Sequence, residues 1–301
     1  MAQPREARLG IDGVQVGQAD LLGSGCTVVL LPEGTIASAE VRGGAPASRE
    51  LDVLNPLMSV QQIDAAVLTG GSAFGLACAD GVMQFLEELG RGVPTPSGRV
   101  PIVPTLSLFD LAEGAARPTA ADGYWAAKAA WEYEDSAQRV LTGTVGAGSG
   151  AKAGRWRGPG AYPGGLVYAE RSLGELVVGA LCAVNAFGDV LAVGATPSIE
   201  PAGVFAALDA ASRDAGNEPP RTHTTIGVLI TNAKLDKVGC HILAQGGHDG
   251  LARAVHPPHT RLDGDAFIAA ATGQVAADVD TVRMLGMLAV SEAIVSAAPA
   301  Q

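Results

Sequence analysis

Aromatic and charged side chains are scarce in this sequence of 301 residues. Aromatic residues make up 4% of the chain and charged residues 17%, while hydrophobic residues reach 48%. This balance excludes the disordered and highly charged classes of protein. With 40 glycines and 18 prolines, the chain is expected to turn often and to fill its core with small aliphatic side chains.

Positive charge is also in short supply. The chain has 20 lysine and arginine residues against 31 acidic ones, which gives a formal net charge of −11. Binding to nucleic acid without sequence preference requires basic side chains that neutralise phosphates. The composition therefore argues against a nucleic-acid partner.

Cysteine pairs and long apolar runs are missing as well. Cys26, Cys78, Cys182 and Cys240 lie far apart, without a Cys-x-x-Cys motif, so we expect buried free thiols in a reducing compartment. Apolar runs such as 176–184 are shorter than the roughly 20 residues that cross a bilayer. The first residues carry no apolar signal segment. The sequence thus predicts a cytoplasmic protein with no membrane partner.

Short apolar runs bounded by turn residues alternate with segments of helical periodicity. Strands are expected in two hairpins, 27–31 with 36–42 and 176–184 with 190–193, and also at 65–69 and 225–231. Helices are expected at 73–89, 124–133, 204–211, 235–255 with a break at Gly246-Gly247, and 274–297. Segment 214–222 is the best linker candidate. Strands flanked by helices on both sides predict a layered α/β or α+β domain.

Several common kinds of site are not supported by the motifs. The glycine-rich segment 146–150 could cradle a phosphate, but the residues after it cannot continue as the helix that a dinucleotide site needs. A tight loop that lets the backbone approach a ligand is the alternative. The five histidines have no standard zinc spacing, and no Gly-x-Ser-x-Gly elbow is present. We therefore expect no metal and no cofactor.

Thr224 is the sharpest catalytic candidate. It lies between the polar linker and the start of an apolar strand, in the segment Thr222-His223-Thr224-Thr225. If the preceding bond were cut, its α-amine, with a reference pKa near 8, could act as a general base for its own hydroxyl. Threonine pairs at strand starts are common, so the residues alone leave a purely structural role open.

A second candidate is the segment Asp263-Gly264-Asp265. Two carboxylates around a glycine can bind a cation, orient a hydroxyl or an amine, or form a simple turn. The sequence alone does not decide among these roles.

Taken together and in order, several segments resemble one family. They are Leu68–Leu76 with Ala79–Val82, Val103-Pro104 with Leu108–Leu111, Gly143–Gly150, Ala183–Asp189, Thr224–Val228, His248–His256 and Asp263–Asp265. This chain resembles the self-processing L-aminopeptidase/D-esterase family, which includes β-peptidyl aminopeptidases and nylon-oligomer hydrolases. The resemblance spans about residues 11–295.

The resemblance implies an α+β fold, an αββα sandwich of N-terminal-nucleophile type. It also implies a single domain, 1–301, made of two autoprocessed segments, 1–223 and 224–301. The cut would fall between His223 and Thr224, and Thr224 would be the nucleophile. Asn185 matches the family asparagine that helps to hold the oxyanion.

Further site residues are implied by the same resemblance. Asp263 and Asp265 match positions that contact the nucleophile and its amine, and either Lys152 or Arg155 would be the active-site cation. Tyr124 is matched to a family tyrosine near the oxyanion. The pocket floor, or alternatively only a tight turn, is assigned to Gly70, Gly71 and Ser72.

Two positions depart from the family pattern. His223 stands where relatives often carry Asn or Gly, and a bulky residue there could slow processing or serve as a proton carrier. Pro163 stands where many relatives have Lys, so a substrate contact inferred from that lysine does not carry over.

The expected protein is a cytoplasmic hydrolase that acts on small peptide, amide or ester substrates through an acyl-enzyme on Thr224. Family members assemble as homo-oligomers, tetramers or larger. Two alternatives stay open at this stage: acyl transfer of the ornithine acetyltransferase type, and a non-catalytic binding protein of the same fold that is never processed.

Overall fold

The computed structural model describes residues 4–132, 139–192, 194–195, 203–206, 209 and 223–299. The expected linker at 214–222 and half of the expected helix at 204–211 lie outside the described residues.

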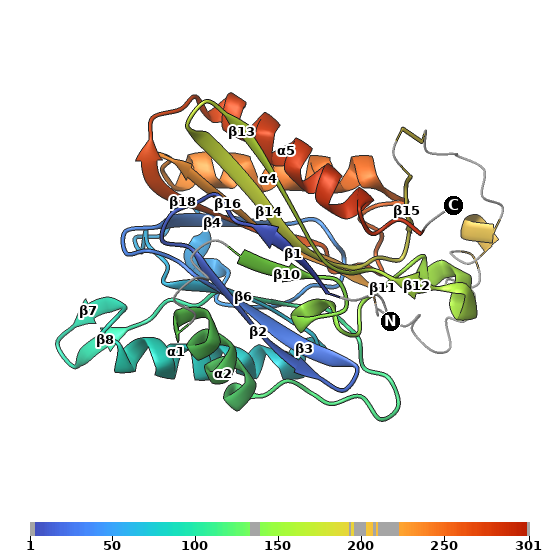
Figure 1. The fold of residues 1–301 in the computed structure, drawn as a ribbon, viewed down its shortest axis with the longest axis horizontal. Coiled ribbons are helices and arrows are strands. Elements are labelled where there is room, and N and C mark those ends of the chain that lie inside the picture. Colours follow the sequence, from blue (N-terminus) through green and yellow to red (C-terminus); the bar gives the residue numbers. More distant parts are fainter. Residues whose placement is uncertain are drawn as a thin grey trace.

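Two five-stranded sheets lie face to face, and each is covered on its outer side by a pair of helices (Figure 1). The N-sheet has the order β2 (Gln15–Leu21), β3 (Ser24–Leu30), β6 (Ala65–Thr69), β9 (Thr105–Ser107), β5 (Ala47–Arg49). The C-sheet has the order β13 (Gly165–Leu173), β14 (Leu176–Asn185), β16 (Thr224–Ala233), β18 (Ala266–Val275), β4 (Ile36–Val41). The helices are α1 (Cys78–Glu88) and α2 (Ala120–Glu132) on the N-sheet, and α4 (Lys237–Ala254) and α5 (Val279–Val295) on the C-sheet.

Four short ladders complete the described part of the chain. They pair β1 (Arg5–Arg8) with β10 (Arg139–Thr142), β7 (Val93–Thr95) with β8 (Gly98–Val100), β11 (Lys152–Ala153) with β12 (Tyr162–Pro163), and β15 (Asp189–Val190) with β17 (Val255–His256). None of the described helices is long and apolar enough to cross a membrane.

The alternation of side chains along the strands builds the layers. In β16, Ile226, Val228 and Ile230 belong to the core between the sheets, whereas Leu229 belongs to the core beneath α4 and α5. Successive side chains of a strand point to opposite faces, so a strand whose two faces are both covered reads as a continuous apolar run. All ten residues of β16 are buried.

Two expected hairpins are wrong. Segment β4 does not pair with β3 but runs antiparallel to β18 in the other sheet. Likewise β15 pairs with β17 and not with β14. In both cases the turn residues are present, but the apolar face of the second strand is buried by a partner that is distant in sequence.

The expected break in the 235–255 helix is also wrong, because α4 runs unbroken through Gly246 and Gly247. A Cβ at Gly246 would lie 2.8 Å from Arg283 Cγ on α5, and one at Gly247 would lie 2.7 Å from Leu229 Cδ1 on β16. The glycines therefore allow close packing of α4 on both neighbours, which offsets their poor helix propensity.

Glycine also sets the close approach of α1 and α2. A Cβ at Gly123 of α2 would lie 2.1 Å from the carbonyl oxygen of Cys78 on α1. That contact is with backbone, so it cannot be relieved by rotating a side chain.

We expect Gly123→Ala to destabilise the protein by about 1–3 kcal/mol, because the overpacked helices must separate. Helix propensity alone would give the opposite sign, a gain of about 1 kcal/mol. Thermal unfolding followed by circular dichroism measures the difference. Ala129→Ser, at an exposed position of the same helix, is the control, and a Gly123→Ala protein as stable as the parent would contradict the packing argument.

Candidate active site

Thr224 is the first residue of β16, a central strand of the C-sheet. Its side chain faces the segment 263–265, because a Cβ at Gly264 would lie 2.9 Å from Thr224 Oγ1. The preceding residue, His223, forms a parallel bridge with Asp263. Thr224 and His223 are 4% and 8% exposed, so the peptide bond between them lies inside the protein.

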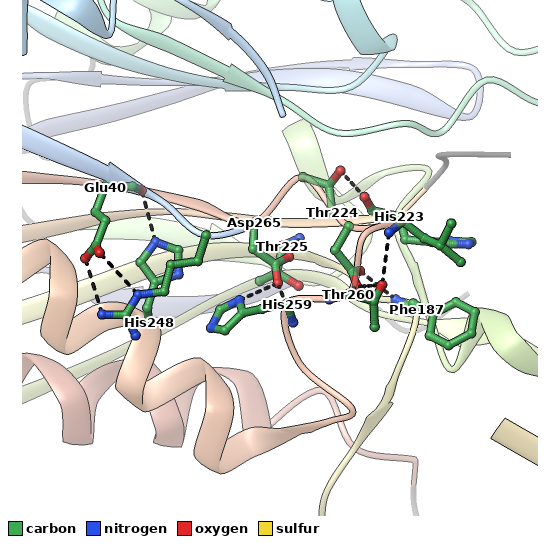
Figure 2. A network of polar contacts seen from close by, with 12 residues as sticks. Glu40, Phe187, His223, Thr224, Thr225, His248, His259, Thr260 and Asp265 are labelled. Atoms are coloured by element: carbon green, nitrogen blue, oxygen red, sulfur yellow. Dashed lines mark hydrogen bonds and ion pairs between the residues drawn. The ribbon is translucent and has the colours of Figure 1, made fainter. Parts of the chain in front are cut away.

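The carbonyl group of His223 receives two donors (Figure 2). Thr224 Oγ1 donates a hydrogen bond to this carbonyl oxygen, and the backbone N–H of Gly264 donates to it at 2.9 Å. A residue with a side chain at 264 would also clash with the carbonyl oxygen of Ala45, at 2.6 Å from its Cβ. Gly264 thus permits the approach of a backbone donor to the carbonyl next to the hydroxyl.

Both aspartates of the segment are buried and point their oxygens at backbone donors. Asp265 Oδ1 accepts from Thr225 N–H at 2.7 Å. Asp263 Oδ1 accepts from Phe187 N–H at 3.1 Å, and its Oδ2 accepts from the N–H and the hydroxyl of Thr260. The pair therefore fixes the two segments that flank the His223–Thr224 bond.

Burial, and then the neighbouring charge of Asp265, raises the pKa of the Asp263 carboxyl from 3.8 to about 7. Two carboxylates in one dry site cannot both ionise at low cost. Asp263 can thus exchange a proton near neutral pH.

Asn185 lies directly opposite Thr224 in the antiparallel ladder between β14 and β16. Its Oδ1 accepts from the backbone N–H of Lys152 at 3.0 Å and from Arg155 Nη1 at 3.3 Å. Its Nδ2 donates to the carbonyl oxygen of Phe109 at 3.0 Å. Because two donors hold Oδ1, the orientation of the amide is determined by its partners.

Arg155, and not Lys152, brings a cationic side chain to Asn185. The Arg155 guanidinium is half-buried, and burial lowers its pKa while Asp110 acts in the opposite direction. Lys152 contributes only its backbone N–H, and its side chain is exposed. The turn between them is set by Gly154, whose φ is +63°, a conformation that favours glycine.

His223 is buried as a neutral imidazole. Burial, and then the charge of Arg155, lowers its pKa to about 3. The ring packs against Phe187, with centroids 5.2 Å apart. Its bulk is therefore accommodated in a pocket, and the imidazole stays uncharged at neutral pH.

The segment Gly70, Gly71 and Ser72 forms a tight turn at the end of β6. Gly71 and Ser72 have φ values of +80° and +52°, and Gly71 N–H donates to Asp110 Oδ1 at 2.7 Å. The turn is thus connected to Asn185 through the neighbouring residues Phe109 and Asp110.

The glycine-rich loop 146–150 is a packing feature. A Cβ at Gly148 would lie 2.0 Å from the backbone nitrogen of Leu166, and one at Gly150 would lie 2.1 Å from the carbonyl oxygen of Gly23. The chain then enters β11 and not a helix, which agrees with the tight-loop interpretation.

Tyr124 is not brought together with the other predicted residues. It lies on α2, which covers the outer face of the N-sheet (Figure 1), and its hydroxyl donates to Glu88 Oε2 at 2.8 Å. Its ring packs edge-on against Phe85. This environment is that of a helix–helix contact.

Three groups at the site were not singled out from the sequence. Asp110 has a weak signal, a buried charged residue three positions after the end of the buried strand β9. Gly264 was noted only as the spacer between two aspartates. His259, which donates from Nδ1 to Asp265 Oδ2 at 2.9 Å, follows two prolines and shows no motif.

Known proteins share this architecture. The model of peptidase family S58 matches residues 9–300, so the chain belongs to that family. An uncharacterised aminopeptidase of Mycobacterium leprae is 42% identical over 307 residues, 92% of this chain and 81% of that protein. A 6-aminohexanoate-oligomer endohydrolase of Paenarthrobacter ureafaciens is 26% identical over 289 residues, 89% of this chain and 75% of that protein.

Solved structures agree on the fold. A β-aminopeptidase of a Burkholderia species superposes with a TM-score of 0.71 at 21% identity, over 99% of this chain and 88% of that one. An L-aminopeptidase D-Ala-esterase/amidase of Ochrobactrum anthropi, described as a variant of the Ntn hydrolase fold, gives 0.68 at 19% identity, over 95% and 84%. The expected N-terminal-nucleophile fold and the expected hydrolase of the aminopeptidase/amidase class are confirmed.

The pH dependence of stability tests the environment of Asp263. A carboxyl whose pKa is raised by folding stabilises the fold fully below its unfolded pKa, and this contribution is lost as the pH rises through the folded pKa. In a Thr224→Ala background, which lacks the hydroxyl of the predicted nucleophile, the free energy of unfolding should fall between pH 4 and pH 7 relative to the same chain with Asp263→Asn. We expect a difference on the order of 2 kcal/mol by urea unfolding.

The control is Asp12→Asn, at an exposed position, which should leave the pH slope of the Thr224→Ala background unchanged. The buried histidines oppose the slope in every variant and cancel in the difference. Parallel pH profiles with and without Asp263→Asn would contradict the raised pKa.

Proposed function

We propose that this chain is an autoproteolytically activated aminopeptidase/amidase whose nucleophile is Thr224. One observation carries the proposal. The Thr224 hydroxyl lies at the carbonyl group of the bond that would be cut, and Gly264 N–H donates to the same carbonyl oxygen at 2.9 Å. A hydroxyl beside a buried, hydrogen-bonded carbonyl is the arrangement that an intramolecular attack requires.

Self-cleavage would begin with attack of Thr224 Oγ1 on the carbonyl carbon of His223. Gly264 N–H would stabilise the negative charge that develops on the oxygen. The proton of Oγ1 passes to the nitrogen of Thr224, and collapse of the intermediate breaks the C–N bond, which leaves His223 esterified to Oγ1 and the amine of Thr224 free. Water then hydrolyses the ester to a carboxylate and the hydroxyl.

The liberated α-amine would serve as the general base for substrate turnover. It removes the proton from Oγ1, which attacks the carbonyl carbon of the substrate and forms an acyl-enzyme. The leaving amine takes up a proton, and water releases the acyl group. Asn185, across the ladder from Thr224, would contribute to the oxyanion site, and Asp263 and Asp265 would hold the amine.

Small peptides, amides and esters with a free amino terminus are the proposed substrates. Two buried carboxylates beside Thr224 favour a cationic amine near the site. The names of the relatives, an aminopeptidase and an oligomer endohydrolase, support hydrolysis of amide bonds.

We further infer a single domain of two segments, 1–223 and 224–301, that stay associated because β16 and β18 are paired with β14 and β4 of the first segment. Four free, buried thiols fit a reducing, cytoplasmic location. Exposed Trp125 and Trp131 on α2 are consistent with homo-oligomer contacts.

Intact-mass analysis tests the self-cleavage. The purified parent protein should give two fragments, of 223 and 301 − 223 = 78 residues, and the smaller one should begin at Thr224. The Thr224→Ala chain should stay whole, since it lacks the attacking hydroxyl. The control, Thr225→Ala, loses the hydroxyl of the next residue and should still be cleaved. An uncleaved parent protein, or a cleaved Thr224→Ala chain, would overturn the proposal.

The two candidate cations can be separated with matched variants. Arg155→Met removes the Nη1 contact to Asn185 Oδ1, and we expect kcat/KM to fall by about 10–1,000-fold. Lys152→Met keeps the backbone N–H at Asn185 and removes only an exposed charge, so we expect a change below about threefold. Hydrolysis of amino-acid p-nitroanilides measures both, and equal losses would contradict the assignment.

A further inference from the structure

A row of polar groups runs from Thr225 on β16 toward α4 (Figure 2). Asp265 Oδ1 accepts from Thr225 N–H, and its Oδ2 accepts from both the backbone N–H and Nδ1 of His259, at 3.2 and 2.9 Å. The His259 ring lies against the His248 ring, with centroids 5.0 Å apart. His248 in turn contacts the Glu40 carbonyl oxygen through Nε2 at 3.0 Å.

These partners fix opposite tautomers on the two rings. His259 must carry a proton on Nδ1 to donate to a carboxylate, and His248 must carry one on Nε2 to donate to a carbonyl. The other two nitrogens, His259 Nε2 and His248 Nδ1, are buried without a hydrogen-bond partner among the described residues. Leaving a buried polar atom unpaired destabilises a fold, so packing alone does not account for the arrangement.

The backbone of His259 adds a second cost. Its φ is +51°, a left-handed conformation that is unfavourable for a residue with a side chain. Such strain persists only where the surroundings impose it, and it clusters at functional sites. The conformation turns both the N–H and Nδ1 of His259 to the same oxygen of Asp265.

The two aspartates differ in one respect. Among the described residues, the carboxyl of Asp263 accepts hydrogen bonds only from Phe187 and Thr260, neither of which titrates. Asp265 has an imidazole partner. The imidazole partner therefore distinguishes Asp265 from Asp263, two buried carboxyls that otherwise accept from backbone N–H and hydroxyl donors.

The charged and titratable groups around the His259–Asp265 contact come from three places. Asp263 lies on the same segment, Asp249 lies on α4, and Glu40 and Arg42 lie on and just after β4, where Arg42 pairs with Glu40 and Asp249. Burial lowers the pKa of His248 to about 4, although its hydrogen bond to the Glu40 carbonyl oxygen acts in the opposite direction. The ring behind His259 is therefore uncharged.

We propose that His259 is a positioning residue for the reaction of Thr224. Its backbone N–H and its Nδ1–H hold Asp265 Oδ2, and this orients the carboxyl so that Oδ1 meets the backbone N–H of Thr225, next to the nucleophile. His248, fixed between the Glu40 carbonyl and the ring of Phe267, keeps the His259 ring in place. This inference rests on the proposed role of Thr224.

Two substitutions separate the hydrogen bond from the strain. Glycine and asparagine both tolerate the left-handed conformation, so neither His259→Gly nor His259→Asn strains the backbone. Only asparagine retains a side-chain donor, at a position close to that of Nδ1. The pair therefore differs in the donor to Asp265 and in little else.

The readout is the acid limb of the kcat/KM–pH profile of the cleaved enzyme on an amino-acid p-nitroanilide. Without the side-chain donor, the carboxylate pair holds its proton to higher pH, so the acid limb of His259→Gly should move up by about one pH unit. His259→Asn should restore the limb to within about 0.3 unit of the parent.

His241→Ala is the control, because His241, like His248, lies on α4 and contacts a carbonyl oxygen of β4, that of Ala39, at 3.0 Å. It should leave the limb where it is. An unmoved limb in His259→Gly, an equal movement in His259→Asn, or an equal movement in His241→Ala would overturn the inference.

Nitrogen-15 NMR of the histidine-labelled parent protein gives a test that needs no stable His259→Gly variant. We expect a protonated Nδ1 signal that disappears in His259→Asn, and its absence would overturn the inference. Failure of the proposed function is recognised separately, since the parent protein would then be uncleaved and inactive. If the parent protein is active and the kcat/KM–pH profile of His259→Gly matches that of the parent, the positioning role is contradicted, while the proposed function stands.

Discussion

The close contact between the His223–Thr224 peptide and the Asp263-Gly264-Asp265 segment is the constraint on which the site depends. Gly264 has no side chain, so its N–H reaches the His223 carbonyl oxygen, to which Thr224 Oγ1 also donates. The aspartates on both sides of it tie down Phe187 and Thr225. The contact forms at one end of two parallel neighbours, β16 and β18, where the sheet itself sets the register.

Burial is what makes this contact chemically useful. Inside the protein little water solvates the charge of the two carboxyls, so Asp263 holds a proton near neutral pH. The same burial keeps His223 neutral. It also makes the electrostatic interaction of the Gly264 N–H with the carbonyl oxygen stronger than it would be in water. Glycines in α4 and between α1 and α2 serve this end indirectly, because they let the outer helices close tightly over both sheets.

The sequence predicted those features that local pattern encodes. Thr224 at the start of an apolar strand, the paired aspartates and the strand 65–69 are readable because their chemistry and their secondary structure lie within a few residues. The pairing of β4 with β18 is not readable in this way, since it depends on which distant strand covers an apolar face. The resemblance supplied the αββα fold, which periodicity alone left undecided between α/β and α+β.

Side-chain direction explains the remaining differences among the site residues. Lys152 and Arg155 are three positions apart, yet only the second faces Asn185, because the chain turns at Gly154 with a positive φ. His259 faces Asp265 through the same kind of backbone conformation, adopted here by a residue that has to be forced into it. A glycine adopts such a positive φ without strain, so its presence indicates only that the chain can turn there. A histidine adopts this conformation only under strain, and His259 Nε2 is buried without a hydrogen-bond partner among the described residues. Both observations indicate that the fold requires the direction in which this ring points.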